Sequence, residues 1–512
     1  MTNLTWAVRM QGVNKRFGLV QANDNVDLQV ADASIHAVVG ENGAGKSTLM
    51  SILYGMYQAD AGRIEVHGQR LDVKSAHDAI AAGIGMVHQH FMLVDTLSVL
   101  DNVMLGAEGH LLLNTAAAHA RAGLTDLMQR TGLKVNLDAL VGDLSVGDRQ
   151  RLEILKTLFR GARVLILDEP TAVLTPQEAV QLFEVLRRLR EQQTTIIIIT
   201  HKLKEVIALC DDVTVMRSGQ VVLRTAVADT CMEDLALAMV GRKVNMGERI
   251  DRSDGSSVGD VVLRAEALSW VDSWGVQRLC DVDIELHAGE ILGVAGVSGN
   301  GQSELLDALS GLLQPDSGCL QVLGDVYQHD HWLTPHRARQ IGLMHVPEDR
   351  HERALVMPFV AWESAVLGYE DDARFSNGPW MRHNHMKDAT QEMMDIFDVR
   401  PRNPMLRCNA LSGGNQQKLV LAREMSRSPK VLLVGQPTRG VDIGAIEFIH
   451  GRIRAMRDAG CAVLLVSSEL DEILALSDRI LVMSQGAITG RLGAQECDET
   501  QLGLLMTAEV TS

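Results

Sequence analysis

The sequence predicts an α/β fold built from two tandem domains of the same type, and two observations support this. The first is an internal repeat: "VVGENGAGKSTLM" at 38–50 returns as "VAGVSGNGQSELL" at 294–306, and "LSVGDRQRLEILK" at 144–156 returns as "LSGGNQQKLVLAR" at 411–423. The second is that short Val/Ile/Leu runs alternate with longer amphipathic segments in each half. This alternation is typical of a parallel sheet flanked by helices.

The repeat also sets the expected domain boundaries. Because the matches are collinear, we expect one domain at 5–243 and a homologous one at 261–508. The segment between them, 244–260, is polar and contains Gly and Ser, as a linker does. Within each half a mainly helical region is expected, at roughly 95–160 and 355–425.

Composition narrows the class of protein. The 512 residues carry a formal net charge of −17, which argues against nucleic acid or an anionic membrane surface as the main partner. The seven cysteines are scattered without a CxxC pair, which is typical of reduced thiols in a cytoplasmic protein. The apolar run "TTIIIIT" is far shorter than the roughly 20 residues that a membrane helix needs. We therefore expect a soluble chain whose membrane role, if any, depends on another subunit.

A glycine-rich segment in the first half, "GENGAGKS", fits the phosphate-loop pattern GxxxxGK[ST]. It lies between an apolar strand and a helical segment, where backbone N–H groups and the helix N-terminus can hold phosphates. Lys46 would then bridge the β- and γ-phosphates of ATP, and the Ser47 hydroxyl would ligate Mg²⁺. The alternative is an ordinary glycine-rich turn between strand and helix. The predicted ATP-binding residues of this loop are Gly40, Glu41, Asn42, Gly43, Ala44, Gly45, Lys46, Ser47 and Thr48.

A second apolar strand, "VLILDEP" at 164–170, delivers two carboxylates at its C-terminal end, where α/β sheets bind ligands. Asp168 can hold Mg²⁺ through water, and Glu169 can orient and deprotonate an attacking water. The alternative is that these two acids have no catalytic role and simply end the strand. Taken alone, a histidine such as His201 is more often a hydrogen-bonded residue at a strand end, and Gln89 could simply be a polar loop residue.

Together and in this order, Gly40–Ser47, Gln89, "LSVGDRQ", "LDEPTAVLT" and His201 resemble the motifs of an ABC-type ATPase. The resemblance covers nearly the whole chain, twice. It implies a P-loop (RecA-like) core in each domain, with a helical subdomain and an N-terminal antiparallel β region. It also implies ATP and Mg²⁺ as cofactors.

The resemblance assigns roles to individual residues. It implies that Glu169, His201 and Gln89 are catalytic, and that Ser47, Gln89 and Asp168 ligate Mg²⁺. Phe17 stands where the family stacks an aromatic ring on adenine, although a core phenylalanine is an equal alternative.

The second half has lost several of these side chains. Gln302 replaces the phosphate-loop lysine, and a neutral amide cannot offset the charge of a triphosphate. Gly435 and Gln436 stand at the positions of the first half's acidic pair, and Ser468 stands at the histidine position. Glutamine is not a general base near neutral pH. Glu348, in "VPEDR", falls near the glutamine-loop position.

For the segments that match the ABC signature motif, the second half is the better match of the two halves. "LSGGN" in the second half lets Ser412 and the N–H groups of Gly413 and Gly414 approach a γ-phosphate. "LSVGD" in the first half places Val146 and Asp148 in that turn.

In the ABC family each phosphate loop faces the signature of the other domain. The resemblance therefore implies one competent composite site, formed by the first half's loop and the second half's signature. It also implies one degenerate site, with Gly301, Gln302, Ser303, Ser145 and Gly147.

The fused layout, with "PEDR" and "PTRGVDIGA", resembles ATPases of simple-sugar and nucleoside importers. The stretches "MVHQHFMLVDTLSVLDNVMLG", "THKLKEV" and "GQPTRG" favour the nucleoside branch, with a pentose or hexose importer as the alternative. The resemblance implies two separate transmembrane permease subunits, an extracytoplasmic solute-binding protein and a place on the cytoplasmic face of the plasma membrane. A second copy of the chain would associate only through the assembled transporter.

Two other functional classes are weighed against the importer. Soluble ABC proteins of ribosomes or nucleic-acid repair also carry two ATPase domains. The acidic balance and the lack of a basic arm or cysteine cluster disfavour them, so no nucleic-acid partner is expected. A nucleotide-gated scaffold without activity is disfavoured by the intact Lys46, Asp168, Glu169 and His201.

Overall fold

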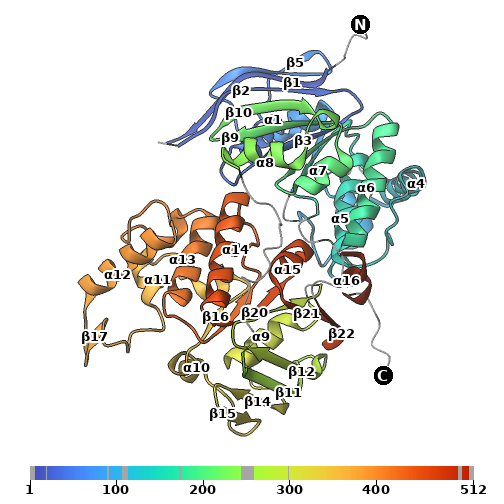
Figure 1. Ribbon diagram of the computed structural model, residues 1–512. Helices are drawn as coiled ribbons and strands as arrows, with labels where there is room; N and C mark the ends of the chain where they lie inside the picture. The colour runs from blue at the N-terminus through green and yellow to red at the C-terminus, as the bar shows by residue number, and fades with distance from the viewer. Residues whose placement is uncertain are drawn as a thin grey trace. The chain divides into compact units, whose positions relative to one another are not determined.

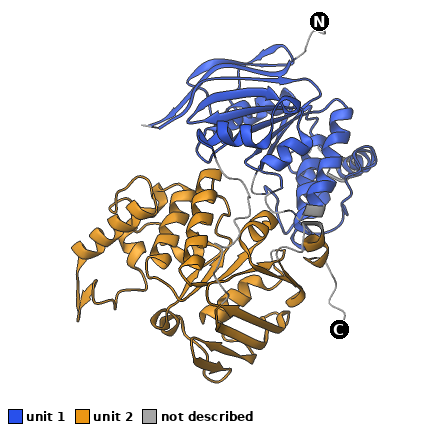
Figure 2. Cartoon of the chain, viewed as in Figure 1, with its two compact units in different colours: residues 1–244 blue, residues 245–512 orange. Residues whose placement is uncertain are grey.

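In a computed structural model, the chain forms two compact units, 1–244 and 245–512 (Figure 2). Each unit is described by itself. The structure describes residues 6–18, 20–88, 91–106, 113–171, 174, 176–243, 259–297, 299–493 and 499–506. Most of the expected linker, 244–258, lies outside these residues.

Unit 1 alternates strands and helices along the chain (Figure 1). Its elements are β1 (Trp6–Phe17), β2 (Val20–Ala31), β3 (Ile35–Gly40), α1 (Lys46–Leu53), β4 (Ala61–Val66), β5 (Gln69–Leu71), α2 (Ala76–Ala81), β6 (Ile84–Val87), α3 (Val99–Met104), α4 (Leu113–Thr131), α5 (Val146–Phe159), β7 (Val164–Asp168), α6 (Pro176–Glu191), β8 (Thr195–Thr200), α7 (Leu203–Leu209), β9 (Asp212–Arg217), β10 (Gln220–Ala226) and α8 (Met232–Val240).

A six-stranded sheet with the order β10-β9-β3-β8-β7-β6 forms the centre of unit 1. Its strands pair in parallel except for β10, which is antiparallel to β9. The central strands are buried along their whole length, which explains why they read as unbroken apolar runs and not as alternating ones. The ends of β3 and β7 carry the two chemical motifs, and β8 lies between these strands.

Unit 1 has two further parts. A four-stranded antiparallel sheet, in the order β2-β1-β4-β5, lies at one end of the unit (Figure 1). Helices α3, α4 and α5 pack on one another between β6 and β7 of the sequence and form the helical subdomain. Because α5 also contacts β6, the signature helix is anchored to the core sheet.

Unit 2 repeats this plan. Its elements are β11 (Val261–Val271), β12 (Gln277–His287), β13 (Ile291–Ala295), α9 (Gln302–Ser310), β14 (Ser317–Val322), β15 (Asp325–Gln328), α10 (Pro335–Ile341), β16 (Leu343–Val346), α11 (Ala361–Val366), β17 (Ser376–Asn377), β18 (Trp380–Met381), α12 (His383–Ile396), α13 (Gly413–Met425), β19 (Val431–Gly435), α14 (Ile443–Asp458), β20 (Ala462–Ser467), α15 (Leu470–Leu476), β21 (Arg479–Ser484), β22 (Ala487–Gly493) and α16 (Glu499–Met506).

The sheets of unit 2 have the same topology, strand for strand. Its six-stranded sheet runs β16-β19-β20-β13-β21-β22, and its antiparallel sheet runs β12-β11-β14-β15. A small hairpin, β17–β18, precedes α12. The predicted fold class, two tandem domains each with a parallel core, an antiparallel region and a helical subdomain, is confirmed. Among the described residues, no helix is long and apolar enough to cross a bilayer.

Candidate functional site

The phosphate loop of unit 1 connects the end of β3 to the start of α1. Gly45 caps the helix at φ 97°, a left-handed conformation that side chains rarely adopt. A Cβ added there would lie 2.2 Å from the carbonyl oxygen of Ala22, and one at Gly40 would lie 2.3 Å from that of Met216. The glycines are therefore required by close backbone packing as well as by the turn.

Lys46 is the first residue of α1 and is only 6% exposed. Its Nζ donates to the carbonyl oxygens of Gly40, at 2.8 Å, and Glu41, at 3.1 Å, so the ammonium group is folded back onto its own loop. Asn42, Gly43 and Ser47 are exposed along this loop, Thr48 is half-buried and Ala44 is buried. The loop thus presents backbone and hydroxyl groups to solvent around the buried ammonium group of Lys46.

The acidic pair lies at the end of β7. Asp168 accepts a hydrogen bond from Ser47. Burial, reinforced by the neighbouring charge of Glu169, raises the pKa of Asp168 to about 6, although Lys46 and Ser47 act in the opposite direction. A serine hydroxyl and a carboxylate are hard oxygen donors of the kind that Mg²⁺ takes, so these two residues fit that ion.

Glu169 and His201 form a hydrogen-bonded pair. Nδ1 of His201 lies 2.8 Å from Oε1 of Glu169, and both side chains are largely buried. Burial alone would raise the pKa of Glu169, but the His201 hydrogen bond and the charges of His201, Lys46 and Lys202 outweigh it and lower the pKa. The carboxylate is therefore kept ionised and oriented, as a general base requires.

Two other predicted residues are placed differently. Gln89 lies outside the described residues. Phe17 is 42% exposed at the end of β1, so it is not a core residue. Its ring makes an edge contact with Tyr57 at 5.1 Å between centroids, and Nζ of Lys15 lies 5.4 Å from its centre. An exposed ring of this kind remains available for stacking.

The phosphate loop of unit 2 keeps its backbone but not its charge. Gly301 caps α9 at φ 100°, as Gly45 caps α1. Gln302 is 5% exposed, and a Cβ at Gly296 would lie 1.8 Å from its Nε2. The amide of Gln302 therefore folds back toward the start of its loop, as Lys46 does, without a positive charge.

At the end of β19 in unit 2, the backbone has the same conformation as at the end of β7, but the side chains differ. Glu169 has φ 48° and Gln436 has φ 46°, so both occupy the left-handed region. Oε1 of Gln436 accepts hydrogen bonds from the N–H of Ser468, at 3.2 Å, and from its hydroxyl, at 3.1 Å. A neutral amide and a hydroxyl thus replace the carboxylate and imidazole of unit 1.

One carboxylate remains in unit 2 that the motif comparison did not assign. The Ser303 hydroxyl donates to Oε2 of Glu348 at 2.6 Å. Sequence reasoning placed Glu348 near the glutamine-loop position but did not connect it to the phosphate loop. The sequence did contain a hint of this contact: an acid, Glu348, is present near the glutamine-loop position, and a glycine, Gly435, leaves space where unit 1 has Asp168.

The signature turn of unit 1 is occupied by its own contacts. The Ser145 hydroxyl donates to the Asp148 carboxylate at 2.9 Å, and Nη1 of Arg151 lies 2.8 Å from the same carboxylate. A Cβ at Gly147 would lie 2.5 Å from Oε1 of Glu178 on α6. The charge of Asp148 is therefore partly neutralised, and the turn is packed closely on the core.

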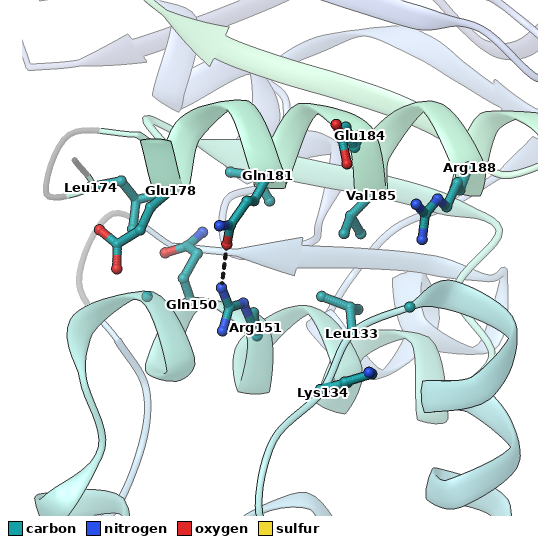
Figure 3. Close-up of a pocket in the computed structure, with 13 residues that line it drawn as sticks. Leu133, Lys134, Gln150, Arg151, Leu174, Glu178, Gln181, Glu184, Val185 and Arg188 are labelled. Carbon is teal, nitrogen blue, oxygen red and sulfur yellow. Dashed lines mark hydrogen bonds between the residues drawn. The ribbon is translucent and has the colours of Figure 1, made fainter. Parts of the chain in front are cut away.

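A cavity of about 310 Å³ lies beside this turn, between α5 and α6. Figure 3 shows Arg151 and Gln181 directed toward each other across it, with a hydrogen bond of 2.8 Å. Gly147 and Glu178 line it, and no residue of the phosphate loop does. This cavity belongs to the junction of the helical subdomain and the core, not to the acidic pair.

The signature turn of unit 2 is more open. Oγ of Ser412 accepts a hydrogen bond from Nδ2 of Asn415 at 2.8 Å, and α13 begins at Gly413. A Cβ at Gly413 would lie 2.9 Å from Nη2 of Arg350, so a guanidinium group stands beside this helix N-terminus. Gly414 is buried.

Comparison with known proteins agrees with this geometry. The ABC transporter family matches residues 23–172 and 279–439. The chain is 43% identical to the guanosine import ATP-binding protein NupO of Bacillus subtilis strain 168, covering 98% of each chain. It is also 43% identical to the nucleoside import ATP-binding protein NupA of Lactococcus lactis, covering 99% of each. A glucose import ATP-binding protein of Haloferax volcanii, TsgD13, is 42% identical over 98% of this chain and 95% of its own.

A solved structure shares the fold over most of the chain. The archaeal ribosome recycling factor aABCE1, in complex with a ribosomal stalk protein, superposes with a TM-score of 0.61 over 94% of this chain and 90% of its own, at 18% identity.

Two domains matched by the same family model, each with a glycine-rich loop between a strand and a helix, define a tandem ABC ATPase. The chain belongs to the ABC transporter family, as an ATP-binding protein that hydrolyses ATP.

Proposed function

We propose that the chain is the ATP-hydrolysing motor subunit of a nucleoside importer, with one hydrolytic and one degenerate nucleotide site. The observation that carries this proposal is the contrast between the two strand ends. Glu169 and His201 form an ionisable pair at 2.8 Å, whereas Gln436 and Ser468 form a neutral pair at 3.1 Å. Only the first pair can accept a proton from an attacking water near neutral pH.

The proposed hydrolytic site combines unit 1's loop and acids with the signature of unit 2. In the ABC family, the phosphate loop of one domain works with the signature of the other. Ser412, Gly413 and Gly414 would then contact the γ-phosphate, and Ser47, Asp168 and Gln89 would hold Mg²⁺. When bound, Mg²⁺ would offset charge on the phosphate oxygens. The degenerate site would combine Gly301, Gln302 and Ser303 with Ser145 and Gly147.

The experiment that tests this assignment is steady-state ATP hydrolysis by the full chain carrying Glu169→Gln. We expect a loss of about 100-fold or more, because general-base catalysis contributes that much. The matched change in the other unit, Gln436→Ala, should leave hydrolysis near the wild-type rate. Appreciable turnover in Glu169→Gln would refute the assignment of the hydrolytic site.

A groove in unit 1 supports docking on a permease. It has a volume of about 290 Å³ and lies between the core and the helical subdomain, lined by Tyr54, His88 and Lys156 among others. Met56 and Met92 lie on its rim, 51% and 58% exposed. Flexible, exposed methionines suit a surface that receives an apolar partner segment.

We propose that two separate transmembrane permease subunits dock on the chain and that an extracytoplasmic solute-binding protein delivers the solute. The chain would then work at the cytoplasmic face of the plasma membrane. Co-purification from membranes tests this: permease subunits are expected with the wild type, and fewer with Met92→Asp. Recovery of ribosomes or DNA instead would favour a soluble ABC protein, a reading that the net charge of −17 disfavours.

The relatives named for guanosine and nucleoside import support a nucleoside as the solute. The relative named for glucose import keeps a pentose or hexose as the alternative. Uptake of labelled nucleosides and sugars in a deletion strain distinguishes the two. Loss of nucleoside uptake with normal sugar uptake is the expected result.

A further inference from the structure

The charged side chains around the phosphate loop of unit 2 come from different positions than those in unit 1. Unit 1 supplies a lysine on the loop and an aspartate at the end of β7, and the aspartate contacts the loop serine Ser47. Unit 2 has neither the lysine nor the aspartate. Its loop serine, Ser303, nevertheless donates to a carboxylate, at 2.6 Å from Oε2 of Glu348.

The carboxylate of unit 2 comes from the neighbouring strand. Glu348 follows β16, which pairs in parallel with β19, and Val346 is in register with Val434. A Cβ at Gly435, the position equivalent to Asp168, would lie 2.5 Å from Cγ of Glu348. The side chain of Glu348 therefore fills the space in which the missing aspartate would begin.

The backbone of the loop is still shaped for phosphates. Gly301 begins α9 in the same left-handed conformation as its counterpart in unit 1, and the buried Gln302 keeps the folded-back position. The loop lacks the positive charge of a lysine, because Gln302 stands at the position that Lys46 has in unit 1. Two arginines, Arg439 and Arg353, act on Glu348 through their charges. Glu304 and Asp307 add negative charge, and Asp307 is itself paired with Arg353.

We propose that Ser303 and Glu348 form a divalent-cation site, so that unit 2 holds a Mg²⁺-nucleotide whose binding depends strictly on the metal. The hydroxyl and carboxylate are hard oxygen donors of the type that Mg²⁺ prefers. Without the cation, the carboxylate repels phosphates that no lysine attracts. With it, the metal supplies the charge that Lys46 supplies in unit 1, while Gln436 leaves the bound nucleotide without a general base.

This inference rests on the proposed function only in taking a nucleotide as the ligand. Its test is photolabelling of the full chain with 8-azido-ADP, in MgCl₂ and in EDTA, followed by mass spectrometry of the labelled peptides. In the wild type we expect Mg²⁺ to raise labelling of unit 2 peptides at least tenfold, and labelling of unit 1 peptides much less.

The decisive variant is Glu348→Met, which keeps the length of the side chain but removes its oxygen donors. It should increase metal-free labelling of unit 2, reduce the Mg²⁺ effect to threefold or less and leave labelling of unit 1 unchanged. Glu304→Met is the matched control: it removes a nearby negative charge but leaves both partners of the Ser303–Glu348 hydrogen bond in place, so the Mg²⁺ effect should persist. As a second readout, electron paramagnetic resonance with Mn²⁺ and ADP should count one bound ion fewer per chain in Glu348→Met.

Three results would overturn the inference: wild-type unit 2 labelled equally with and without Mg²⁺, no labelling of unit 2, or an equal loss in both conditions in Glu348→Met. The last would mean that Glu348 only supports the loop. Each can occur while unit 1 is labelled normally and ATP is hydrolysed, so failure here is distinct from failure of the proposed function.

Discussion

Nδ1 of His201 lies 2.8 Å from Oε1 of Glu169, and at the equivalent place in unit 2 the hydroxyl of Ser468 lies 3.1 Å from Oε1 of Gln436. Both contacts link the ends of the strands β7 and β8 in unit 1, and β19 and β20 in unit 2. Both units therefore have a hydrogen bond at this place, but only the pair in unit 1 consists of side chains that exchange protons near neutral pH.

Replacing His201 by alanine should lower the rate of ATP hydrolysis by about 100-fold or more, because Glu169 loses the hydrogen bond that orients it and keeps it ionised. ATP binding, measured by equilibrium dialysis, should change little. Ser468→Ala is the control, and its hydrolysis rate should stay close to that of the wild type. Equal losses in the two variants would contradict the assignment of chemistry to unit 1.

Replacing Lys46 by alanine should reduce hydrolysis about 100-fold, as expected when a group that stabilises developing charge is removed. Gln302→Ala should leave the rate largely intact, because the amide of Gln302 carries no charge to lose. Both side chains are buried in the same folded-back position, so the comparison isolates charge from shape. A larger loss in Gln302→Ala would show that the second loop takes part in turnover.

Restoring an acid at the strand end of unit 2 should destabilise that unit. In Gly435→Asp, the new Cβ would lie 2.5 Å from Cγ of Glu348 and 2.9 Å from Cδ1 of Leu306. Overpacking of this kind costs about 1–3 kcal/mol of unfolding free energy. Five of the six tryptophans lie in unit 2, so urea denaturation followed by tryptophan fluorescence reports mainly on it.

The double variant Gly435→Asp/Glu348→Ala should recover part of this loss, because Cγ of Glu348 is gone. A single variant as stable as the wild type would show that Glu348 moves freely out of the space it fills.

Removing one partner of the buried ion pair in the helical subdomain of unit 2 should be costly. Nε of Arg423 donates to Glu424 at 2.7 Å, both side chains are less than a tenth exposed, and Tyr369 donates to the same carboxylate. Arg423→Met would leave Glu424 buried without its cation, which costs about 3–5 kcal/mol. Denaturation followed by tryptophan fluorescence measures the change.

The control for this prediction is the exposed pair of Arg337 and Asp325, also in unit 2, because exposed ion pairs contribute little. Arg337→Met should therefore leave the denaturation midpoint almost unchanged. A similar shift in both variants would contradict the role of burial.

The repeat in the sequence was enough to predict the fold, because each matched segment marks a strand end or helix start. "VVGENGAGKS" and "VAGVSGNGQS" follow β3 and β13, which occupy the same place in sheets of identical order. Local patterns of this kind are written in consecutive residues, so the sequence displays them directly.

What the sequence could not show are contacts made across strands and helices. Gly147 is required because Glu178 of a different helix lies against it, and Glu348 reaches Ser303 from a neighbouring strand. Motif comparison aligns positions one by one, and so it records Gly435 as a lost acid without finding the acid that took its space. Phe17, for which a core position was an alternative, is exposed because it lies at the last position of β1, paired with Val20 at the start of β2.

The left-handed backbone at Glu169 and Gln436 has a wider consequence. Such a conformation costs of order 1–3 kcal/mol for a non-glycine residue, and it is usually retained where chemistry needs it. Unit 2 has the same conformation at a glutamine, and there the N–H of Gln436 donates to the carbonyl oxygen of Val466 at 2.8 Å, joining two strands. The bend is thus a structural joint that both units share, and in unit 1 it carries a carboxylate. Changing side chains alone is therefore enough to alter the chemistry at this joint, while the backbone that joins the two strands stays the same.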